Sequence, residues 1–397
     1  VTGTNGKTSI SHWLAKAFGA LGRKSALLGT LGNGFPGALQ ATQNTTPDAL
    51  LLHGLLAEYV SQEAQAAVME VSSHALTQGR VSGVRYDVAL LTNLTRDHLD
   101  YHGDMQSYAA AKRRLFDWAH LKHAVLNLDD AFGAELAEQL QDSIPEVIGY
   151  GMEDGSLKLA ERLGIRMVHG DLTQMDAQGL TLQLHTSWGA APLQSRLLGK
   201  FNASNLLGAL AVLLVSGIDL EDAVRELGAQ KAVPGRMQTL GGKDAPTVVV
   251  DYAHTPDALE KVLITLREVT EPSGGKVVCV FGCGGDRDRG KRPMMGTVAA
   301  RFADVRIVTS DNPRSETPGA IIDAIVTGMQ GEHQIIEDRA RAIAHAIDNA
   351  HANDTVLIAG KGHEDYQEIA GVRHPFSDAE IAHRALSMWA PRERWPS

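Results

Sequence analysis

Cysteine is scarce in this chain: only Cys279 and Cys283 occur among 397 residues. Two cysteines cannot build the disulfide framework of a small secreted protein. They also supply too few thiolates for a structural zinc site without a second ligand pair. We therefore expect two buried thiols beside a glycine-rich turn, in a protein of the reducing cytoplasm.

Long apolar runs and an excess of basic residues are missing too. No stretch approaches the roughly 20 apolar residues of a membrane-spanning helix, so we expect no membrane association. Lys and Arg number 37 against 47 Asp and Glu, a formal net charge of −10. A nucleic-acid backbone calls for clustered positive charge, so we expect small-molecule partners and no nucleic acid. Small anionic substrates remain compatible, because they need only a local pocket.

A glycine-rich turn opens the chain, in the order Val-Thr-Gly-Thr-Asn-Gly-Lys-Thr. Its backbone N–H groups can surround phosphates, Lys7 can reach the terminal phosphates, and Thr8 can bind Mg²⁺. A helix expected over residues 8–21 adds the positive potential of its N-terminus. The generic phosphate-loop pattern has glycine where Val1 stands, and the alternative is a plain turn with Lys7 in solvent. Because a strand should feed this turn, we expect the natural chain to begin earlier.

Apolar runs alternate with helical patterns, which predicts an α/β fold with a parallel sheet covered on both faces. In the first part of the chain the expected strands cover residues 25–30, 66–71, 88–94 and 124–128, and expected helices cover 8–21 and 47–59. Between residues 163 and 198 apolar residues recur at every second position, which predicts a small antiparallel addition to the sheet. A strongly apolar helix is expected over residues 201–216.

A stretch rich in glycine, proline and lysine over residues 233–244 suits a domain boundary. After it the expected strands cover 247–252, 276–281, 304–310 and 355–359, and the expected helices cover 257–269, 318–329 and 338–349. We therefore expect a P-loop domain over residues 1–235 and a smaller Rossmann-like domain over 236–397, with its polar loops at the carboxyl ends of the strands.

Three strand ends of the first predicted sheet carry residues suited to phosphate or metal chemistry. The glycine-rich turn is the first, and Glu70, in the second, is a candidate Mg²⁺ ligand. Ser73, taken alone, is equally well explained as a helix cap. The third strand end offers a metal site or a solvated polar ridge, through Asp97, His98, Asp100 and His102. Convergence of the three at one sheet edge favours a single Mg²⁺–phosphate site.

Two other segments of the first domain are less specific. Residues 108–116 predict an amphipathic helix with a basic solvated face, and nothing in the spacing singles out Lys112. Asn202 and Asn205 lie three residues apart at a helix start, where their amides could bind an adenine edge or serve as caps.

Four polar loops follow four strands of the second predicted sheet, at residues 251–256, 281–293, 309–314 and 359–364. Asp251 could bind ribose hydroxyls and Tyr252 could stack on a base. The second loop combines a glycine turn with four cations, which favours an anion site. Each loop could be an ordinary turn, but four of them at one sheet edge favour a substrate pocket.

Taken in order, these motifs resemble those of the Mur ligases, the ATP-dependent amide-forming ligases of peptidoglycan precursor synthesis. The resemblance extends from Val1 to about His383, and Val1 is normal in that family. The matching segments are Thr-Gly-Thr-Asn-Gly-Lys-Thr (2–8), Asn-Thr-Thr-Pro (44–47), Glu-Val-Ser-Ser-His (70–74), Asn-Leu-Thr-Arg-Asp-His-Leu-Asp-Tyr-His (93–102), Asp-Tyr-Ala-His (251–254), Asp-Asn-Pro-Arg (311–314) and Gly-Lys-Gly-His-Glu (360–364). The family also leads us to expect a uridine-binding domain of roughly a hundred residues before Val1. Without that preceding part, we expect the central sheet to be incomplete and the fragment to be inactive.

The resemblance implies a role for each matching residue. ATP would be held by Gly3, Thr4, Asn5, Gly6, Lys7, Thr8, Asn202, Asn205, Arg236 and Asp251. Mg²⁺ would be bound by Thr8, Glu70, His98 and Lys112, with Lys112 carbamylated by CO₂ so that a cation becomes a carboxylate; Lys7, His98 and Lys112 would be catalytic. The UDP-sugar dipeptide would contact Thr45, Thr46, Ser72, Gln78 and Arg80. The incoming amino acid would contact Arg287, Asp311, Asn312, Pro313, Arg314, Gly360 and Glu364.

The implied reaction phosphorylates a carboxylate with ATP and then lets an amine attack the acyl phosphate. Arg314 favours meso-diaminopimelate over lysine as the amine, because a guanidinium pairs with the distal carboxylate that lysine lacks. The expected acyl substrate is UDP-N-acetylmuramoyl-L-Ala-D-Glu, handled by a cytoplasmic monomer. The alternatives are a lysine-adding homologue, a ligase like folylpolyglutamate synthase, or a P-loop ATPase that acts as a switch.

Overall fold

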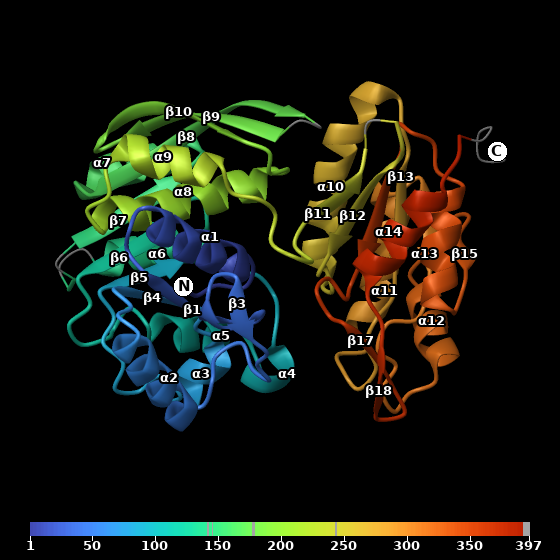
Figure 1. Cartoon of the computed structure of the whole chain (residues 1–397), viewed down its shortest axis with the longest axis horizontal. Coiled ribbons are helices and arrows are strands. Elements are labelled where there is room, and N and C mark those ends of the chain that lie inside the picture. The colour runs from blue at the N-terminus through green and yellow to red at the C-terminus, as the bar shows by residue number, and fades with distance from the viewer. Residues whose placement is uncertain (141–142, 145, 177–178, 243, 392–397) are drawn as a thin grey trace. The chain divides into compact units, whose positions relative to one another are not determined.

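The computed structural model describes residues 1–140, 143–144, 146–176, 179–242 and 244–391. The chain divides into two compact units, Val1–Lys231 and Ala232–Ser397 (Figure 1). Both units are α/β, as the alternating pattern predicts. Within the described ranges every helix is too short or too polar to cross a lipid bilayer.

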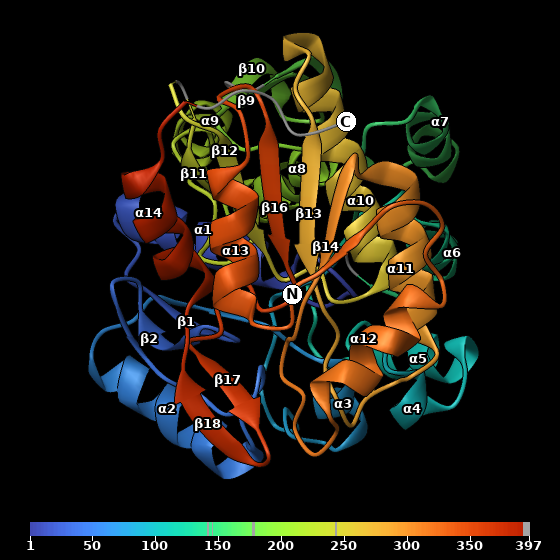
Figure 2. The same ribbon diagram turned by 90° about the vertical axis from the view of Figure 1, so that its right-hand side faces the viewer.

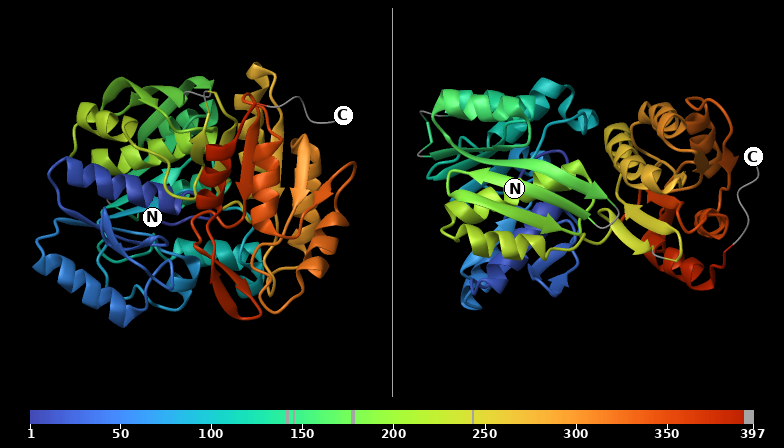
Figure 3. Two further views of the ribbon diagram at one scale, coloured as in Figure 1. Left: turned by 45° about the vertical axis from the view of Figure 1, so that its right-hand side comes forward. Right: turned by 90° about the horizontal axis from the view of Figure 1, so that it is seen from above.

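Two sheets form the first unit. The smaller sheet has the order β3-β2-β1-β4, built from β1 (Ser25–Gly29), β2 (Gly32–Phe35), β3 (Ala38–Gln40) and β4 (Ala66–Met69). Strand β2 is antiparallel to both β1 and β3, and β1 is parallel to β4. The larger has the order β10-β9-β8-β7-β6-β5, built from β5 (Val88–Leu91), β6 (His123–Asn127), β7 (Glu146–Gly151), β8 (Arg166–Asp176), β9 (Gly179–Thr186) and β10 (Gly189–Ser195). Strands β5 to β8 are parallel, and β8 to β10 are antiparallel (Figure 3), which confirms the predicted antiparallel addition.

Val1 and Thr2 lie between these two sheets. The Val1 amino group donates to Met69 O at 2.8 Å, and the Val71 N–H donates to Val1 O at 2.8 Å. On the other side, the Thr2 N–H donates to Leu90 O at 2.8 Å in a parallel bridge. Parallel neighbours end at the same edge, so the glycine-rich turn opens between the segments that follow β4 and β5.

Helices cover both faces of the first unit. Helix α1 (Lys7–Ala20) packs on β1 and β4, and α8 (Lys200–Val215) packs across β5 to β8. Helix α8 is buried almost all round, as its unbroken apolar sequence predicts. The opposite core contains α2 (Ala49–Ser61), α3 (Ser73–Thr77), α6 (Ala131–Leu140) and α7 (Asp154–Leu163). The remaining helices are α4 (Leu99–His102), α5 (Met105–Arg113) and α9 (Leu220–Gly228).

The second unit has one six-stranded sheet in the order β11-β12-β16-β13-β14-β15 (Figure 2). Its strands are β11 (Gln238–Gly241), β12 (Thr247–Asp251), β13 (Val277–Phe281), β14 (Val305–Val308), β15 (Gln334–Ile335) and β16 (Thr355–Ala359), and all but β11 are parallel. Strands β13 and β16 are buried along their whole length, which matches their largely apolar sequences. A separate hairpin pairs β17 (Tyr366–Ile369) with β18 (Val372–Pro375).

Helices α13 (Arg339–Asp348) and α14 (Asp378–Met388) pack on one face of this sheet, where they share a core with its valine and isoleucine side chains. Helices α10 (Pro256–Thr270) and α11 (Lys291–Phe302) pack against each other, with α12 (Pro318–Val326) beside α11 and a short 3₁₀ turn over Glu271–Ser273. The parallel order brings the polar loops after β12, β13, β14 and β16 to one edge, as the sequence predicts.

Candidate active site

The glycine-rich turn is braced by the loop after β5. The Thr4 N–H donates to Asn93 O at 2.8 Å, and the Asn5 N–H donates to Asn93 Oδ1 at 3.0 Å. Gly3 has a φ of 141°, and a β-carbon there would collide with the Thr92 hydroxyl. Lys7 Nζ donates to the carbonyls of Gly3 and Thr4, each at 2.8 Å. The turn therefore has a fixed shape, with the lysine held across it.

Glu70 supplies a carboxylate beside this turn. Its side chain is fully buried, and it accepts hydrogen bonds from the Thr8 hydroxyl at 2.9 Å and the Thr30 hydroxyl at 3.1 Å. The Thr30 N–H adds a third bond at 2.8 Å. None of these donors is charged, whereas a buried carboxylate is costly without a compensating charge. Carboxylate and hydroxyl oxygens are ligands that Mg²⁺ accepts, so Glu70 and Thr8 fit such an ion.

Lys112 is buried rather than solvated, so the interpretation of its helix face as solvent-exposed is wrong at this position. Only 1% of the residue is exposed, and its Nζ donates to Gly3 O at 2.8 Å. The same Nζ lies 4.5 Å from the ring centre of Tyr108, whose hydroxyl shares a hydrogen bond with Thr4 at 3.2 Å. Burial, reinforced by nearby Lys7, holds the pKa of Lys112 well below its usual value. Burial therefore shifts this amine toward its neutral, nucleophilic form.

Histidines gather on the next loop. His98 opens α4 in a left-handed conformation, with a φ of 53°, and its Nε2 lies 3.3 Å from Asp97 Oδ2. The rings of His98 and His74 are 4.8 Å apart, and His102 Nε2 lies 2.9 Å from Ser73 Oγ. Burial lowers the pKa of all three histidines, which favours neutral imidazoles at pH 7. In the described ranges no group of three or more His, Cys, Asp or Glu side chains is placed to hold a metal ion, so the choice between a metal site and a polar ridge at this loop stays open and the metal role of His98 stays a prediction.

The five residues expected at the sugar-nucleotide dipeptide form one hydrogen-bonded network. The Thr46 hydroxyl donates to Glu70 O at 2.8 Å and accepts from the Ser72 N–H at 3.0 Å. Arg80 Nη1 donates to Thr46 O at 3.0 Å, and its Nε donates to Gln78 Oε1 at 2.8 Å. The Thr30 hydroxyl lies 3.1 Å from that of Thr45, which ties the fifth residue to the same network beside Glu70.

The residues expected around adenosine are divided between the two units. Asn202 and Asn205 are buried at the start of α8, and the amide of Asn205 lies against Gly6. In the second unit, the Arg236 guanidinium lies 4.4 Å from the ring centre of Tyr252. Next to this tyrosine, burial raises the pKa of Asp251 to about 6, although Arg236 and the Met237 N–H oppose the shift.

The loops after β14 and β16 meet through side chains. Asn312 Nδ2 donates to Glu364 Oε2 at 2.8 Å, and Asp311 Oδ1 accepts from the Asn312 N–H at 2.6 Å. Gly360 has a φ of 119°, and a β-carbon there would stand 2.5 Å from Asp311 Oδ2. Pro313, the next residue, is buried. Four of the expected amino-acid-binding residues, Asp311, Asn312, Gly360 and Glu364, therefore lie together where these two loops meet.

Arg314 is fixed at both its backbone and its side chain. It has a left-handed φ of 52° and forms a β-bridge with Ile369 of β17. Its Nη1 donates to Gly285 O at 2.8 Å, and its Nε lies 3.8 Å from Glu368 Oε2. Arg287, by contrast, is exposed and donates only to Asp286 O, at 3.1 Å, among the hydrogen bonds of the described residues. Arg314 is thus preorganised, whereas Arg287 is not.

Several residues at these loops escape sequence reasoning. They include Thr30, which holds Glu70; Tyr108, which contacts Lys112; and Lys361, which binds Asn312. Lys361 lies inside a recognised motif, so its charge could have drawn attention to it. Thr30 carries no such signal, because its partner Glu70 is 40 positions away in the sequence, and neither does Tyr108, whose hydroxyl pairs with Thr4 at a separation of 104 positions.

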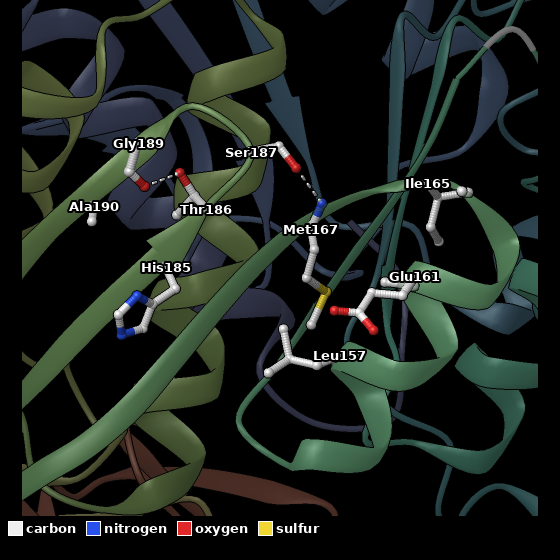
Figure 4. A pocket seen from close by; sticks show the side chains of 11 residues that line it. Leu157, Glu161, Ile165, Met167, His185, Thr186, Ser187, Gly189 and Ala190 are labelled. Carbon is white, nitrogen blue, oxygen red and sulfur yellow. Dashed lines mark hydrogen bonds between the residues drawn. The ribbon is translucent and has the colours of Figure 1, made fainter.

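A depression of about 570 Å³ lies elsewhere in the first unit, between α7 and the β9–β10 turn (Figure 4). Leu157, Met167 and Ile165 form an apolar part of its lining, and Glu161 and His185 add polar groups. None of its lining residues belongs to the motif loops. The candidate site is therefore defined by converging loops and not by this depression.

Comparison with known proteins gives the same picture over the whole chain. Residues 1–213 match the model of the Mur ligase middle domain, and residues 235–362 match that of the Mur ligase glutamate ligase domain. A "UDP-N-acetylmuramoyl-L-alanyl-D-glutamate--2,6-diaminopimelate ligase" from Chromobacterium violaceum is 52% identical over 396 residues, which cover 99% of this chain and 77% of the relative. A ligase of the same name from Pseudomonas aeruginosa is 52% identical over 98% of this chain and 77% of its own length.

Solved structures agree. One of a ligase of that name has a TM-score of 0.69 and 41% identity, covering 97% of this chain and 77% of its own. A folylpolyglutamate synthase from Mycobacterium tuberculosis has a TM-score of 0.65 over 98% of this chain and 91% of its own, at 20% identity. At that identity the second likeness shows a shared fold alone.

Proposed function

The chain belongs to the Mur ligases, and we propose that it joins meso-diaminopimelate to UDP-N-acetylmuramoyl-L-Ala-D-Glu in an ATP-dependent reaction of peptidoglycan precursor synthesis. The observation that carries the reaction class is the meeting of the glycine-rich turn with buried Glu70 and buried Lys112. The family uses ATP and Mg²⁺. Residues 1–235 act as the ATP-binding domain and residues 236–397 as the amino-acid-binding domain, in a cytoplasmic monomer.

The first step activates a carboxylate of the dipeptide. The carboxylate attacks the γ-phosphorus of ATP, which gives an acyl phosphate and ADP. The N–H groups of residues 3–8 bind the phosphates, and Lys7 neutralises charge on the γ-phosphoryl group as it moves. Glu70, Thr8 and His98 would hold Mg²⁺, which would supply neutralisation of the phosphate charge. The network of Thr45, Thr46, Ser72, Gln78 and Arg80 holds the acyl substrate.

Lys112 would become a metal ligand only after it is carbamylated. Its neutral amine adds to CO₂ and releases a proton, which gives a carbamate with a carboxylate end. Three observations support this step: burial of the amine, its depressed pKa, and its contact with the phosphate-binding turn. A carbamate supplies the oxygen ligands that an ammonium group cannot.

The second step forms the amide. The amine of diaminopimelate attacks the acyl carbon, and phosphate and a proton leave. The second unit contributes the amine site, where Arg314 pairs with the distal carboxylate and Asn312 and Glu364 face the same ligand. Asp251 and Arg236 hold the ribose side of ATP. Bringing the amine to the acyl phosphate converts a bimolecular reaction into a nearly unimolecular one and excludes water from a hydrolysable intermediate.

The test is ADP release measured with each substrate omitted in turn. A ligase releases ADP rapidly only when the UDP-sugar dipeptide and the amine are both present. A P-loop switch would release ADP without either, and that result would contradict the proposal. Replacing meso-diaminopimelate by lysine in the same ADP-release assay shows which of the two amino acids the enzyme uses.

Replacement of Arg314 tests the choice of amine. We expect Arg314→Ala to raise the KM for meso-diaminopimelate at least about tenfold, since a hydrogen bond to a charged group contributes about 1.5–3 kcal/mol. The KM for ATP should stay within about twofold, because the guanidinium contacts Gly285 and Glu368 and not the ATP-binding residues. Steady-state kinetics provide both constants. Arg341→Ala, on the exposed side of α13, is the control, and an unchanged KM for diaminopimelate in Arg314→Ala would contradict the role.

A further inference from the structure

Lys361 is a completely buried lysine in the loop that follows β16. Its Nζ donates to Asn312 Oδ1 at 2.9 Å and to Glu364 Oε2 at 3.1 Å. The Nζ also lies 5.4 Å from the ring centre of Tyr366. A buried ammonium group is costly unless it is paired and hydrogen-bonded, and here a carboxylate and an amide oxygen satisfy it.

The position of Lys361 determines how Asn312 is oriented. Asn312 Oδ1 accepts from Lys361 and from the Glu368 N–H at 2.9 Å, while its Nδ2 donates to Glu364 at 2.8 Å. A rotated amide would place an NH₂ group against the ammonium and against another N–H, so this orientation is strongly preferred. With Lys361 neutralised, that preference weakens.

The same lysine fixes one oxygen of Glu364. Both side-chain donors that reach this carboxylate among the described residues, from Lys361 and Asn312, reach Oε2. Glu364 is the outermost member of the group, with 17% of its side chain exposed. These contacts leave Oε1 available to a ligand, and an amino-acid ammonium group is a complementary partner for a carboxylate oxygen.

We propose that Lys361 is a positioning residue for the amine substrate: it orients Asn312 and, together with Asn312, fixes Glu364 so that the Glu364 carboxylate binds the ammonium group of the amino acid whose carboxylate is bound by Arg314. This inference rests on the proposed ligase function. Lys361 acts through its two neighbours and does not itself touch the substrate. The preference for an amino acid whose distal end carries both an ammonium group and a carboxylate then depends on the buried charge of Lys361 as well as on the residues that contact the substrate.

The experiment measures steady-state kinetics of Lys361→Met in the intact enzyme, with meso-diaminopimelate, lysine and ATP varied in turn. We expect the KM for meso-diaminopimelate to rise about tenfold or more, the scale of a lost hydrogen bond to a charged group, while the KM for ATP and the kcat change less than about threefold. Lys361→Gln keeps a hydrogen-bond donor without the charge, so its KM for meso-diaminopimelate should lie between those of the unaltered enzyme and Lys361→Met. It also provides the test if Lys361→Met does not fold. Lys261→Met is the matched control, because Lys261 forms an exposed pair with Asp257 in the same unit.

A double-variant cycle separates positioning from general destabilisation. If Lys361 acts through Glu364, then adding Lys361→Met to Glu364→Gln should raise the KM for diaminopimelate less than about twofold further. Equal changes in the KM for ATP and for diaminopimelate, fully additive effects, or an unchanged KM for diaminopimelate would each overturn the inference. Absence of amine-dependent ADP release in the unaltered enzyme would instead overturn the proposed function, so the two failures are distinguishable.

Discussion

Lys112→Ala will reduce kcat by about 100-fold or more while the enzyme remains folded, since a group that stabilises charge in the transition state is commonly worth that much. The lysine is 1% exposed, and its Nζ contacts the Gly3 carbonyl of the phosphate-binding turn at 2.8 Å. If the amine is carbamylated, the variant removes a carboxylate from the metal site.

A dependence on CO₂ distinguishes carbamylation from a role for the ammonium group. The unaltered enzyme should lose activity in buffers freed of CO₂ and regain it with added bicarbonate. Lys112→Ala should not respond to bicarbonate, but a small carboxylate such as acetate should restore part of its activity by occupying the vacated space. Carbon-13 NMR of the enzyme supplied with labelled bicarbonate provides a readout independent of catalysis.

Lys16→Ala is the matched control, because Lys16 lies on an exposed position of α1 in the same unit. Its activity should equal that of the unaltered enzyme. Two results would contradict the role of Lys112: a variant that keeps more than about a tenth of the kcat, or an active enzyme that shows no response to CO₂.

The fold could be predicted largely because local patterns agree with the tertiary structure. The apolar run of α8 predicts a helix buried all round, and the apolar segments of β12 and β16 predict strands covered on both faces. The change of period before β9 likewise predicts the antiparallel addition. Element ends differ from the predictions by a few residues, since hydrogen bonding at the ends depends on neighbours that the local pattern does not contain.

The site was predictable only where a motif marks it. The turn at residues 3–8 and Glu70 belong to segments whose residue types already indicate phosphate and metal chemistry. Lys112 appeared to belong to a basic helix face, because its burial results from packing against Gly3, 109 positions earlier in the chain. Lys361 and Asn312 are 49 positions apart, and only the order of the strands in the sheet brings them together. Contacts of this kind depend on topology, which spacing does not reveal.

Arg339 and Asp378 illustrate the same point and support the largest stability change that we expect. Arg339 stands at the start of α13 and Asp378 at the start of α14, and both side chains are fully buried. The pair is bidentate, with Nε to Oδ1 at 2.8 Å and Nη2 to Oδ2 at 2.7 Å. Burial disfavours a charged guanidinium, yet the pKa of Arg339 lies above its usual value because Asp378 more than offsets that cost.

The guanidinium also holds the two loops of the amino-acid site from behind. Its Nη2 donates to Ala359 O at 3.0 Å and its Nη1 to Ser310 O at 3.4 Å. These carbonyls directly precede Gly360 and Asp311, which lie in the loops after β16 and β14. The ion pair is therefore placed to affect both stability and substrate binding.

Asp378→Asn should lower the free energy of unfolding of the second unit by about 3–5 kcal/mol, because it leaves a buried guanidinium without its counter-charge. Urea unfolding of the intact protein, followed by hydrogen exchange of the β14 and β16 amides, measures the loss where it occurs. Lys261→Met, which breaks an exposed ion pair, should cost no more than about 1 kcal/mol. A loss in Asp378→Asn as small as in this control would contradict the assigned importance of the pair.

The double variant Arg339→Met with Asp378→Leu separates the two roles of the pair. Apolar side chains of similar size often replace a buried ion pair without loss of stability, so this variant should regain most of the free energy of unfolding that Asp378→Asn loses. It cannot restore the hydrogen bonds to Ala359 O and Ser310 O, since no donor remains. We therefore expect a stable protein whose KM for meso-diaminopimelate stays elevated. A normal KM in this stable variant would show that the loops keep their positions without the guanidinium, and that the pair contributes to stability alone.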